Sequence, residues 1–446
     1  MKKRILCLAM TLILVVNVFA GCKKSQEESM ASASETSMES SSSSESESTA
    51  SQKTAASTGP VSIKIFDNSP EYEAAMKACI AEYKKIKPNV TVNLETVWVD
   101  YLIKLKAKLN SGDIPDVFTT SAGSEIKTYE KYSEDLTKEP FVKSLKDDVK
   151  KIMSDEDKVY GFPMKINAFG MLYNKEIFEN NKITVPKTLI ELGTACEKLK
   201  AAGIQPFTTG YKEWPVFKNM LMHFFDAAQP NDTQGLVKKF TEGKAKLADY
   251  PIINDNWFNF VDMTVKYGDE KPLETDRNAE IAAFAGGKAA MLLGQGSWVE
   301  AEITKINPKL KIGFTGYPTS GNPAESLLVT GADQAVRIYK DSKVKKDALE
   351  LYNWLYTSDY GAKWFEETAK VIPPIKDAPI PNTQIGNEVK NYLSSNKAGE
   401  LSINYATDDF HMKLGEIMQG YIARTYDKEK AVKEVETAWQ KLGKAK

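Results

Sequence analysis

The chain has 446 residues and almost balanced charge, with 59 Lys and Arg against 60 Asp and Glu. Nothing in the sequence resembles a basic stripe, so we expect no nucleic-acid partner. Two histidines and four cysteines argue against a Cys/His metal cluster, and we expect neither a metal nor a cofactor. The roughly 386 residues that follow position 60 suffice for two or three domains.

Residues 1–21 have the pattern of a secretory signal peptide. Basic residues at positions 2–4 precede an apolar run over 5–16 that is short for a membrane span. The small pair Ala20-Gly21 before Cys22 resembles a bacterial lipobox, in which the cysteine becomes the lipidated N-terminus. We therefore expect an exported protein whose Cys22 lipid anchors it to the outer face of the cell membrane. The alternative is an ordinary signal peptide with an incidental cysteine.

Residues 22–60 are expected to form a disordered tether. From residue 23 onward this segment contains no Leu, Ile, Val, Phe, Tyr or Trp, and Ser, Glu, Thr and Ala dominate it. Such a segment cannot bury enough apolar surface to offset the entropy lost on ordering. As a flexible coil it would reach about 30–35 Å. A low-complexity tail without a role is the alternative.

The next part of the chain alternates between strand and helix patterns. Apolar alternation and helical spacing predict, in turn, strand 61–66, helix 71–86, strand 90–99, helix 101–109 and strand 116–120. This order predicts an α/β fold with a parallel sheet. Ligands of such sheets bind beyond the carboxyl ends of the strands, which makes Asn68, Ser121 and Ser124 candidate contacts.

Helical spacing dominates after residue 189. The predicted helices are 189–202, 216–228, 255–267, 277–285, 344–356, 360–367, 410–424 and 428–442. A short strand is expected after Gly331. Cys79 and Cys196 lie on apolar helix faces, so we expect buried free thiols rather than a disulfide. No later apolar run is long enough to predict a membrane span.

Several short phrases occur along the chain in a fixed order. They are SGDIPDV at 111–117, VYGFP at 159–163, LYNKEIF at 172–178, PKT at 186–188, KAAGIQPF at 200–207, FAGGKAAM at 284–291 and GSW at 296–298. Each phrase is weak alone, but the ordered set resembles the extracellular solute-binding proteins of family 1, the carbohydrate-binding branch of ABC importers. The resemblance covers essentially all of residues 61–446.

The resemblance implies a two-lobed, periplasmic-binding-protein-like α/β fold with discontinuous lobes and a hinge of crossover strands. Residues 61–166 and 318–364 would form the first lobe, and residues 167–317 and 365–446 the second. It also implies a monomeric, non-enzymatic protein. Such a protein would trap a sugar or oligosaccharide between its lobes and deliver it to a membrane-embedded ABC permease.

A sugar presents flat apolar faces and a rim of hydroxyls, so its site needs aromatic platforms and hydrogen-bonding side chains. Trp298 follows a glycine-rich turn after a buried strand, and the resemblance makes it the tryptophan of the cleft. A core position is the alternative. The remaining candidates are Trp214, its neighbour Glu213, Asn167, Asp333, and the pair Asp408 and Asp409 before the penultimate helix.

Two other classes of function remain open from the sequence. An exported glycoside hydrolase would also carry aromatic residues, and it needs two carboxylates across the scissile bond. The same fold could instead bind a polyamine, a metal chelate or a phosphonate. Charged cargo calls for a charged cluster, whereas the candidate loops are mostly neutral and aromatic. Trp354, Trp364 and Trp439 lie on apolar helix faces, where core positions are expected.

Overall fold

The computed structural model describes residues 59–230 and 232–445, which all belong to one compact unit. The expected signal peptide, the lipidation site Cys22 and the tether up to residue 58 lie outside the described residues. Within the described part of the chain, we find no helix with the length and apolar character needed to cross a membrane.

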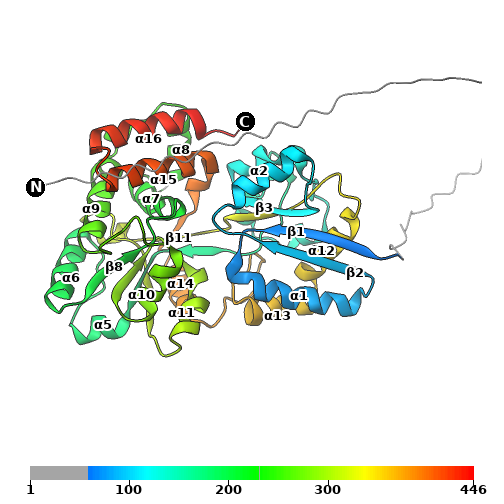
Figure 1. Cartoon of the computed structure of the whole chain (residues 1–446), viewed down its shortest axis with the longest axis horizontal. Helices are drawn as coiled ribbons and strands as arrows, with labels where there is room; N and C mark the ends of the chain where they lie inside the picture. Colours follow the sequence, from blue (N-terminus) through cyan, green and yellow to red (C-terminus); the bar gives the residue numbers. More distant parts are fainter. Residues whose placement is uncertain (1–58, 231, 446) are drawn as a thin grey trace, which may run out of the picture. The chain divides into compact units, whose positions relative to one another are not determined.

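The first sheet is the α/β sheet that the sequence predicts. Its strands are β1 (Val61–Asp67), β2 (Val90–Thr96), β3 (Val117–Ser121) and β12 (Gln334–Ile338), in the order β12-β3-β1-β2. Strand β1 is parallel to both of its neighbours, and β12 joins the edge of β3 antiparallel. Helices α1 (Glu73–Ile86) and α2 (Tyr101–Ser111) cover opposite faces of this sheet (Figure 1). Alternate residues of β1 therefore enter two separate apolar clusters.

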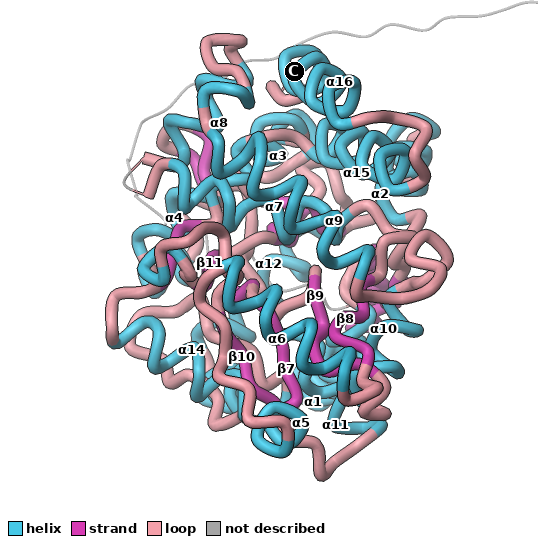
Figure 2. The backbone as a smooth tube through the Cα atoms, turned by 90° about the vertical axis from the view of Figure 1, so that its left-hand side faces the viewer, coloured by secondary structure: helices cyan, strands magenta, loops and turns pink. Residues whose placement is uncertain are grey.

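The second sheet is mixed. Its strands are β7 (Met171–Asn174), β8 (Gln205–Thr209), β9 (Ala289–Leu293) and β10 (Ile312–Thr315), in the order β10-β7-β9-β8. Only β8 and β9 run parallel. Figure 2 views the molecule from this side, where α5 (Lys175–Asn180), α6 (Leu189–Ala201) and α9 (Phe258–Lys266) lie around the sheet.

A small third sheet lies between the other two. It contains β6 (Asn167–Phe169), β11 (Leu328–Gly331) and β13 (Ala398–Glu400), in the order β13-β11-β6. Strands β6 and β11 pair antiparallel, and in Figure 1 β11 runs between the two halves of the molecule. The chain thus passes between the large sheets more than once, which confirms the two-lobed α/β fold.

The remaining elements complete the two halves. They are α3 (Ser124–Thr128), α4 (Asp147–Ile152), β4 (Ser154–Asp155), β5 (Lys158–Val159), α7 (Pro215–Ala228), α8 (Thr233–Thr241), α10 (Arg277–Ala285), α11 (Glu300–Ile306), α12 (Lys345–Thr357), α13 (Asp359–Lys363), α14 (Gln384–Ser394), α15 (Asp408–Ile422) and α16 (Lys428–Leu442). Helices α9 and α13 adjoin π-helical turns at Ile252–Trp257 and Trp364–Thr368. Strand β2 ends at Thr96 instead of extending to residue 99, and α14 has no counterpart among the predicted helices.

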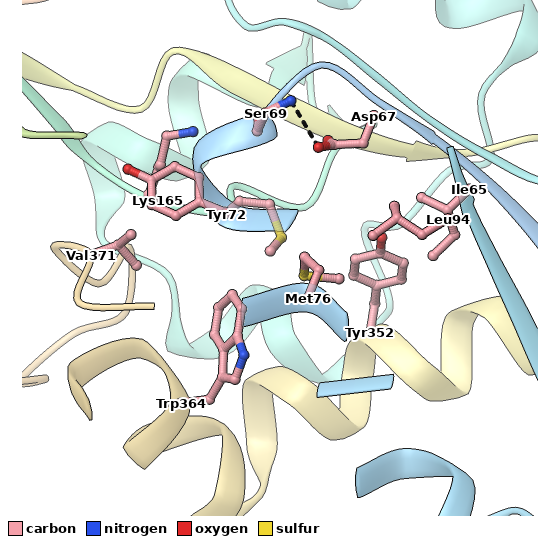
Figure 3. Close-up of a pocket in the computed structure, with 11 residues that line it drawn as sticks. Ile65, Asp67, Ser69, Tyr72, Met76, Leu94, Lys165, Tyr352, Trp364 and Val371 are labelled. Atoms are coloured by element: carbon pink, nitrogen blue, oxygen red, sulfur yellow. Dashed lines mark hydrogen bonds between the residues drawn. The ribbon is translucent and has the colours of Figure 1, made fainter. Parts of the chain in front are cut away.

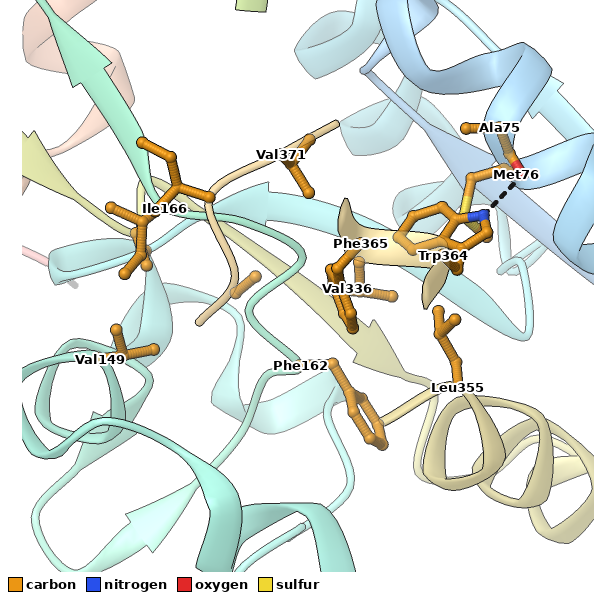
Figure 4. Close-up of a cluster of buried hydrophobic side chains, with 14 of the residues drawn as sticks. Ala75, Met76, Val149, Phe162, Ile166, Val336, Leu355, Trp364, Phe365 and Val371 are labelled. Atoms are coloured by element: carbon orange, nitrogen blue, oxygen red, sulfur yellow. Dashed lines mark hydrogen bonds between the residues drawn. The ribbon is translucent and has the colours of Figure 1, made fainter. Parts of the chain in front are cut away.

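The core around the first sheet includes two aromatic residues from the second π-helical turn (Figure 4). Trp364 is 1 % exposed, and its indole Nε1 donates to the carbonyl of Ala75 at 2.9 Å. Phe365 is equally buried beside it. The expected core positions of Trp364 and Trp439 are confirmed, while Trp354 is half-buried. The free, buried thiols of Cys79 and Cys196 are also confirmed.

Candidate functional site

A cavity of about 1090 Å³, its open mouth included, is lined by the first large sheet and its loops, by strand β6 of the small sheet, and by loops and helices of the second-sheet half. Most of the side chains predicted from the sequence line this cavity: Asn68, Ser121, Asn167, Glu213, Trp214, Trp298 and Asp333. They come from segments far apart in the chain. The fold therefore gathers them around one space large enough for a small solute.

Ser124 and Asp409 do not line this cavity. The Ser124 hydroxyl donates to the carbonyl of Asn404 at 3.0 Å, and Asp409 forms an ion pair with Lys106 at 2.5 Å. Asp408 lines the cavity instead. Successive side chains on a helix point about 100° apart, and at the start of α15 this difference turns Asp408 toward the cavity and Asp409 toward Lys106.

Trp298 follows a turn that depends on two glycines, Gly294 and Gly296. All five residues of β9 are buried, and Gly294 then turns the chain with φ of +74°. A Cβ atom on Gly296 would lie 2.3 Å from the Trp298 ring, so only glycine allows this approach. The ring packs edge-on against Phe169, with centroids 5.1 Å apart, and stays half-buried. It is therefore held firmly while part of it remains available to a ligand.

Two further tryptophans line the cavity from opposite sides. Trp214 precedes α7 in the second-sheet half, whereas Trp98 lies in the loop after β2 in the first-sheet half. The indole of Trp98 donates to Glu213 at 2.9 Å and thereby connects the two halves. The guanidinium of Arg277 lies 5.5 Å from the centroid of the Trp98 ring. Sequence reasoning missed Trp98 because no recognisable phrase surrounds it.

Amide and carboxylate side chains occupy the floor of the cavity in pairs. Asn167, which is 3 % exposed, donates its amide to Asp333 at 2.9 Å. The amide of Gln334 donates to Asn68 at 3.0 Å. Asn167 comes from β6 and Asn68 from the loop after β1, while Asp333 precedes β12 and Gln334 begins it. The pairs fix the orientation of polar groups that a hydroxyl-rich ligand can use.

A second polar group connects the halves beside α15. The Ser121 hydroxyl donates to Asp408 at 2.9 Å, and the backbone N–H of Asp408 donates to Glu125 at 2.8 Å. Burial and the nearby Asp408 carboxylate raise the pKa of Glu125 to about 7. His411 lies 3.7 Å from Asp408, and burial lowers the pKa of its imidazole to about 4.

The charged side chains of the cavity have partners within the protein. Lys165 lies 3.7 Å from Glu71, and both side chains are more than nine-tenths buried. Burial raises the pKa of Glu71, while the charge of Lys165 opposes that rise. Lys218 donates to Asn404 at 3.2 Å, and Lys212 lies 3.6 Å from Asp276. The lining as a whole carries four carboxylates (Glu71, Glu213, Asp333, Asp408) and three lysines (Lys165, Lys212, Lys218), so its formal charges nearly balance.

A smaller cavity of about 410 Å³ lies inside the first-sheet half (Figure 3). Its walls are mainly apolar, and its polar rim includes Asp67, which accepts from the backbone N–H of Ser69 at 2.8 Å. Lys165 lines both cavities. No group of three or more His, Cys, Asp or Glu among residues 59–230 and 232–445 is arranged to hold a metal ion.

The sequence from residue 78 to residue 392 matches the family of bacterial extracellular solute-binding proteins. This chain belongs to that family. Among its curated relatives, the multiple sugar-binding protein of Streptococcus mutans is 25 % identical over 371 residues, which are 77 % of this solute-binding protein and 84 % of the relative. The melibiose/raffinose/stachyose-binding protein MelE of Bacillus subtilis is 22 % identical over 310 residues, or 67 % and 70 % of the two chains.

Solved structures resemble this solute-binding protein over most of its length. A chitin oligosaccharide binding protein has a TM-score of 0.74 at 20 % identity and covers 86 % of this chain and 99 % of its own. The binding protein RafE in complex with raffinose also has a TM-score of 0.74, at 22 % identity, with 85 % and 99 % covered. At such low identity, the likeness establishes the shared fold.

Proposed function

We propose that this solute-binding protein captures a sugar or oligosaccharide between its two lobes and delivers it to an ABC permease. The observation that carries the proposal is the set of three tryptophans, Trp98, Trp214 and Trp298, that line one cavity from both halves. Indole rings suit the apolar faces of sugars, and the amide and carboxylate pairs beside them suit the hydroxyls. Two relatives that are named as sugar-binding proteins, the multiple sugar-binding protein and MelE, support the same cargo.

The charge balance of the cavity favours a neutral cargo over a charged one. A polyamine needs uncompensated carboxylates, and a phosphonate needs uncompensated cations. Here the four carboxylates of the lining face three lysines, and Glu71 forms an ion pair with Lys165. A charged cargo would have to displace these contacts before it could bind.

We further propose that the protein is not an enzyme. A glycoside hydrolase requires one carboxyl group that is free to protonate the leaving oxygen and a second that acts as nucleophile or base. Each of the four cavity-lining carboxyl groups instead has a partner within the protein: Glu71 pairs with Lys165, and Glu213, Asp333 and Asp408 accept hydrogen bonds from Trp98, Asn167 and Ser121. Incubation with raffinose and chitin oligosaccharides should release no reducing sugar. Catalytic release would favour the hydrolase alternative.

We propose two lobes, with two refinements to their boundaries. The first lobe contains residues 61–166 and 318–364, and the second contains residues 167–317 and 365–446. Asn256 donates to the carbonyl of Thr319, which associates the segment after 318 with the second lobe. The N–H of Lys376 donates to Ser144, and Ile372 bridges to Ile166. These contacts favour crossovers near residues 330 and 376 over 318 and 365.

We also propose that the protein is a monomer, exported by its signal peptide and held at the outer face of the membrane through lipidated Cys22. The composition of residues 22–60 supports a tether between the lipid and the binding unit. Cys22→Ala should release the protein into the medium or leave it unprocessed. Unchanged maturation and membrane retention of this variant would contradict the anchor.

A thermal-shift screen tests the proposed cargo. Raffinose, stachyose and chitin oligosaccharides would be compared with spermidine and a phosphonate at matched concentrations. A ligand that binds only the folded state adds about 2.7 kcal/mol at 100 times its Kd, so the cargo should raise Tm clearly. Stabilisation by spermidine or the phosphonate alone would overturn the sugar proposal.

A further inference from the structure

A chain of hydrogen bonds runs from Trp298 into the interior of the second lobe. The Trp298 indole Nε1 donates to Gln295 Oε1 at 3.0 Å, and the Gln295 amide donates to Glu280 Oε1 at 2.5 Å. The other carboxylate oxygen of Glu280 accepts from the backbone N–H of Gly210. Three elements are thereby joined: the turn after β9, helix α10 and the loop after β8.

The interior members of this chain do not line the cavity. Glu280 is 0 % exposed and Gln295 is 5 % exposed, and neither is among the residues around the cavity. Burial raises the pKa of Glu280 well above its usual range, while the hydrogen bonds from Gln295 and Gly210 oppose that rise. A buried carboxyl is costly to retain unless its hydrogen bonds perform a task that a smaller or neutral side chain would not.

The donors at the two ends of the chain explain why a carboxyl group stands in the middle. The indole N–H of Trp298 and the backbone N–H of Gly210 can only donate. Gln295 accepts from Trp298 and donates to Glu280. The side chain at position 280 must therefore accept from both Gln295 and Gly210. Both oxygens of Glu280 face N–H donors, as suits an ionised carboxylate that only accepts, whereas a glutamine has one accepting oxygen.

We infer that Glu280, acting through Gln295, is the positioning residue that holds the Trp298 ring at the edge of the cavity. Its importance for cargo rests on the function proposed above, but its effect on the ring does not. The indole Nε1 is fixed by Gln295, and the ring edge is fixed by Phe169. Loss of the first contact leaves the ring free to turn about the second.

The inference makes a prediction that depends on donor and acceptor matching rather than on size. In Glu280→Gln, the new amide group faces either Gly210 or Gln295. If it faces Gly210, two donors meet there. If it faces Gln295, the Gln295 amide must reverse, and two donors then meet at Trp298. Either orientation leaves one contact broken.

A second substitution should repair the first. In the double variant Glu280→Gln/Gln295→Glu, Trp298 donates to a carboxylate at 295, that carboxylate accepts from the amide at 280, and the oxygen at 280 accepts from Gly210. Every contact is satisfied again, and the number of carboxyl groups is unchanged. Gln295→Glu alone should fail at a pH where both carboxyl groups are ionised, because two acceptors then face each other.

Fluorine NMR of protein labelled with 5-fluorotryptophan reports on the ring without any ligand. The chain has seven tryptophans, and the Trp298 signal is assigned by its loss in Trp298→Phe. Trp364, whose indole donates to Ala75 in the core, is the internal reference. We expect each single variant to shift or broaden the Trp298 signal and not the Trp364 signal. The double variant should restore it.

Binding is measured separately by calorimetry with raffinose. Each single variant should weaken affinity by on the order of tenfold, the usual effect of one lost hydrogen bond, and the double variant should recover it. If wild type binds no sugar in the panel, the proposed function fails, while the NMR result still tests the positioning role.

An unchanged Trp298 signal in a folded Glu280→Gln protein would overturn the inference, as would single variants that the double variant does not rescue. If Glu280→Gln does not fold, Gln295→Met provides the test, because it removes the bridge and keeps a side chain of similar size. A Trp298 signal that is undisturbed in Gln295→Met would also overturn the inference.

Discussion

Replacing Trp298 by alanine distinguishes a binding platform from a core side chain. A ring that contacts cargo near the centre of an interface typically contributes about 2 kcal/mol or more, which corresponds to about 30-fold in Kd. A fully buried tryptophan that is truncated typically costs about 3–5 kcal/mol of folding stability. The same variant, measured for binding and for unfolding, therefore separates the two roles.

The contacts of Trp298 indicate a smaller stability loss than that of a fully buried tryptophan. Trp298 forms one aromatic pair, with Phe169, worth about 0.5–1.5 kcal/mol in addition to the apolar surface that the ring buries against both core clusters. It has one hydrogen bond, to Gln295, which contributes a further 0.5–1.5 kcal/mol or so. Because the side chain is only half-buried, we expect Trp298→Ala to cost less stability than the about 3–5 kcal/mol of a fully buried tryptophan, while affinity falls at least about 30-fold.

Trp364→Ala is the matched control for this measurement. Trp364 is 1 % exposed and lies outside the large cavity, so its truncation should cost about 3–5 kcal/mol of stability and leave the affinity of the folded protein nearly unchanged. Calorimetric titration and urea denaturation of both variants give the comparison. If Trp298→Ala binds raffinose as wild type does, or loses as much stability as Trp364→Ala, the platform role is refuted and Trp214 becomes the leading candidate.

Three further predictions follow from particular contacts. Trp98→Phe removes the indole donor to Glu213, so affinity should fall several-fold with little change in Tm; equal affinity would exclude Trp98 from the site. Burial raises the pKa of Asp226 from 3.8 to about 8, so its contribution to stability is full below about pH 4 and is lost as pH rises through 8. Asp226→Asn should flatten the fall in urea-measured stability between pH 6.5 and 8, and an unchanged slope would refute that assignment. Cargo that contacts both lobes should reduce the radius of gyration in small-angle scattering, whereas an identical profile at saturation would indicate a rigid binder.

The strands and helices of the first sheet were predicted well because the apolar pattern of each one lies within a short stretch of sequence. The strand at 61–66 and the helix at 101–109 have clear apolar periodicity, and Gly112 ends the helix in a left-handed conformation that suits glycine. The antiparallel pairing of β12 with β3 was not predictable in the same way. It joins residues more than 200 positions apart, and no local signal encodes such a partner.

The candidate site was predictable where a phrase or a strand end identified it. Trp298 and Trp214 came from the family resemblance, and Asn68 and Ser121 from the ends of parallel strands. Trp98 could not be found because its partner Glu213 lies 115 positions further along the chain, and no local pattern connects the two.

The sequence also did not predict which helix residues face the cavity or which carboxylate becomes buried. Asp408 and Asp409 are adjacent, and only the packing of α15 decides which of them faces the cavity. Glu280 looks like an ordinary helix-surface carboxylate until α10 is packed against the β9 turn, where it becomes fully buried.

Hydrogen exchange with and without the identified sugar tests the central claim most directly. Cargo held between the lobes should slow amide exchange in segments from both sides of the cavity. These are residues 97–103 after β2, 213–219 at the start of α7, 295–299 after β9 and 408–412 at the start of α15. Protection of segments from both lobes is the predicted result. Protection confined to one lobe, or centred on the smaller cavity beside Tyr72, would contradict it.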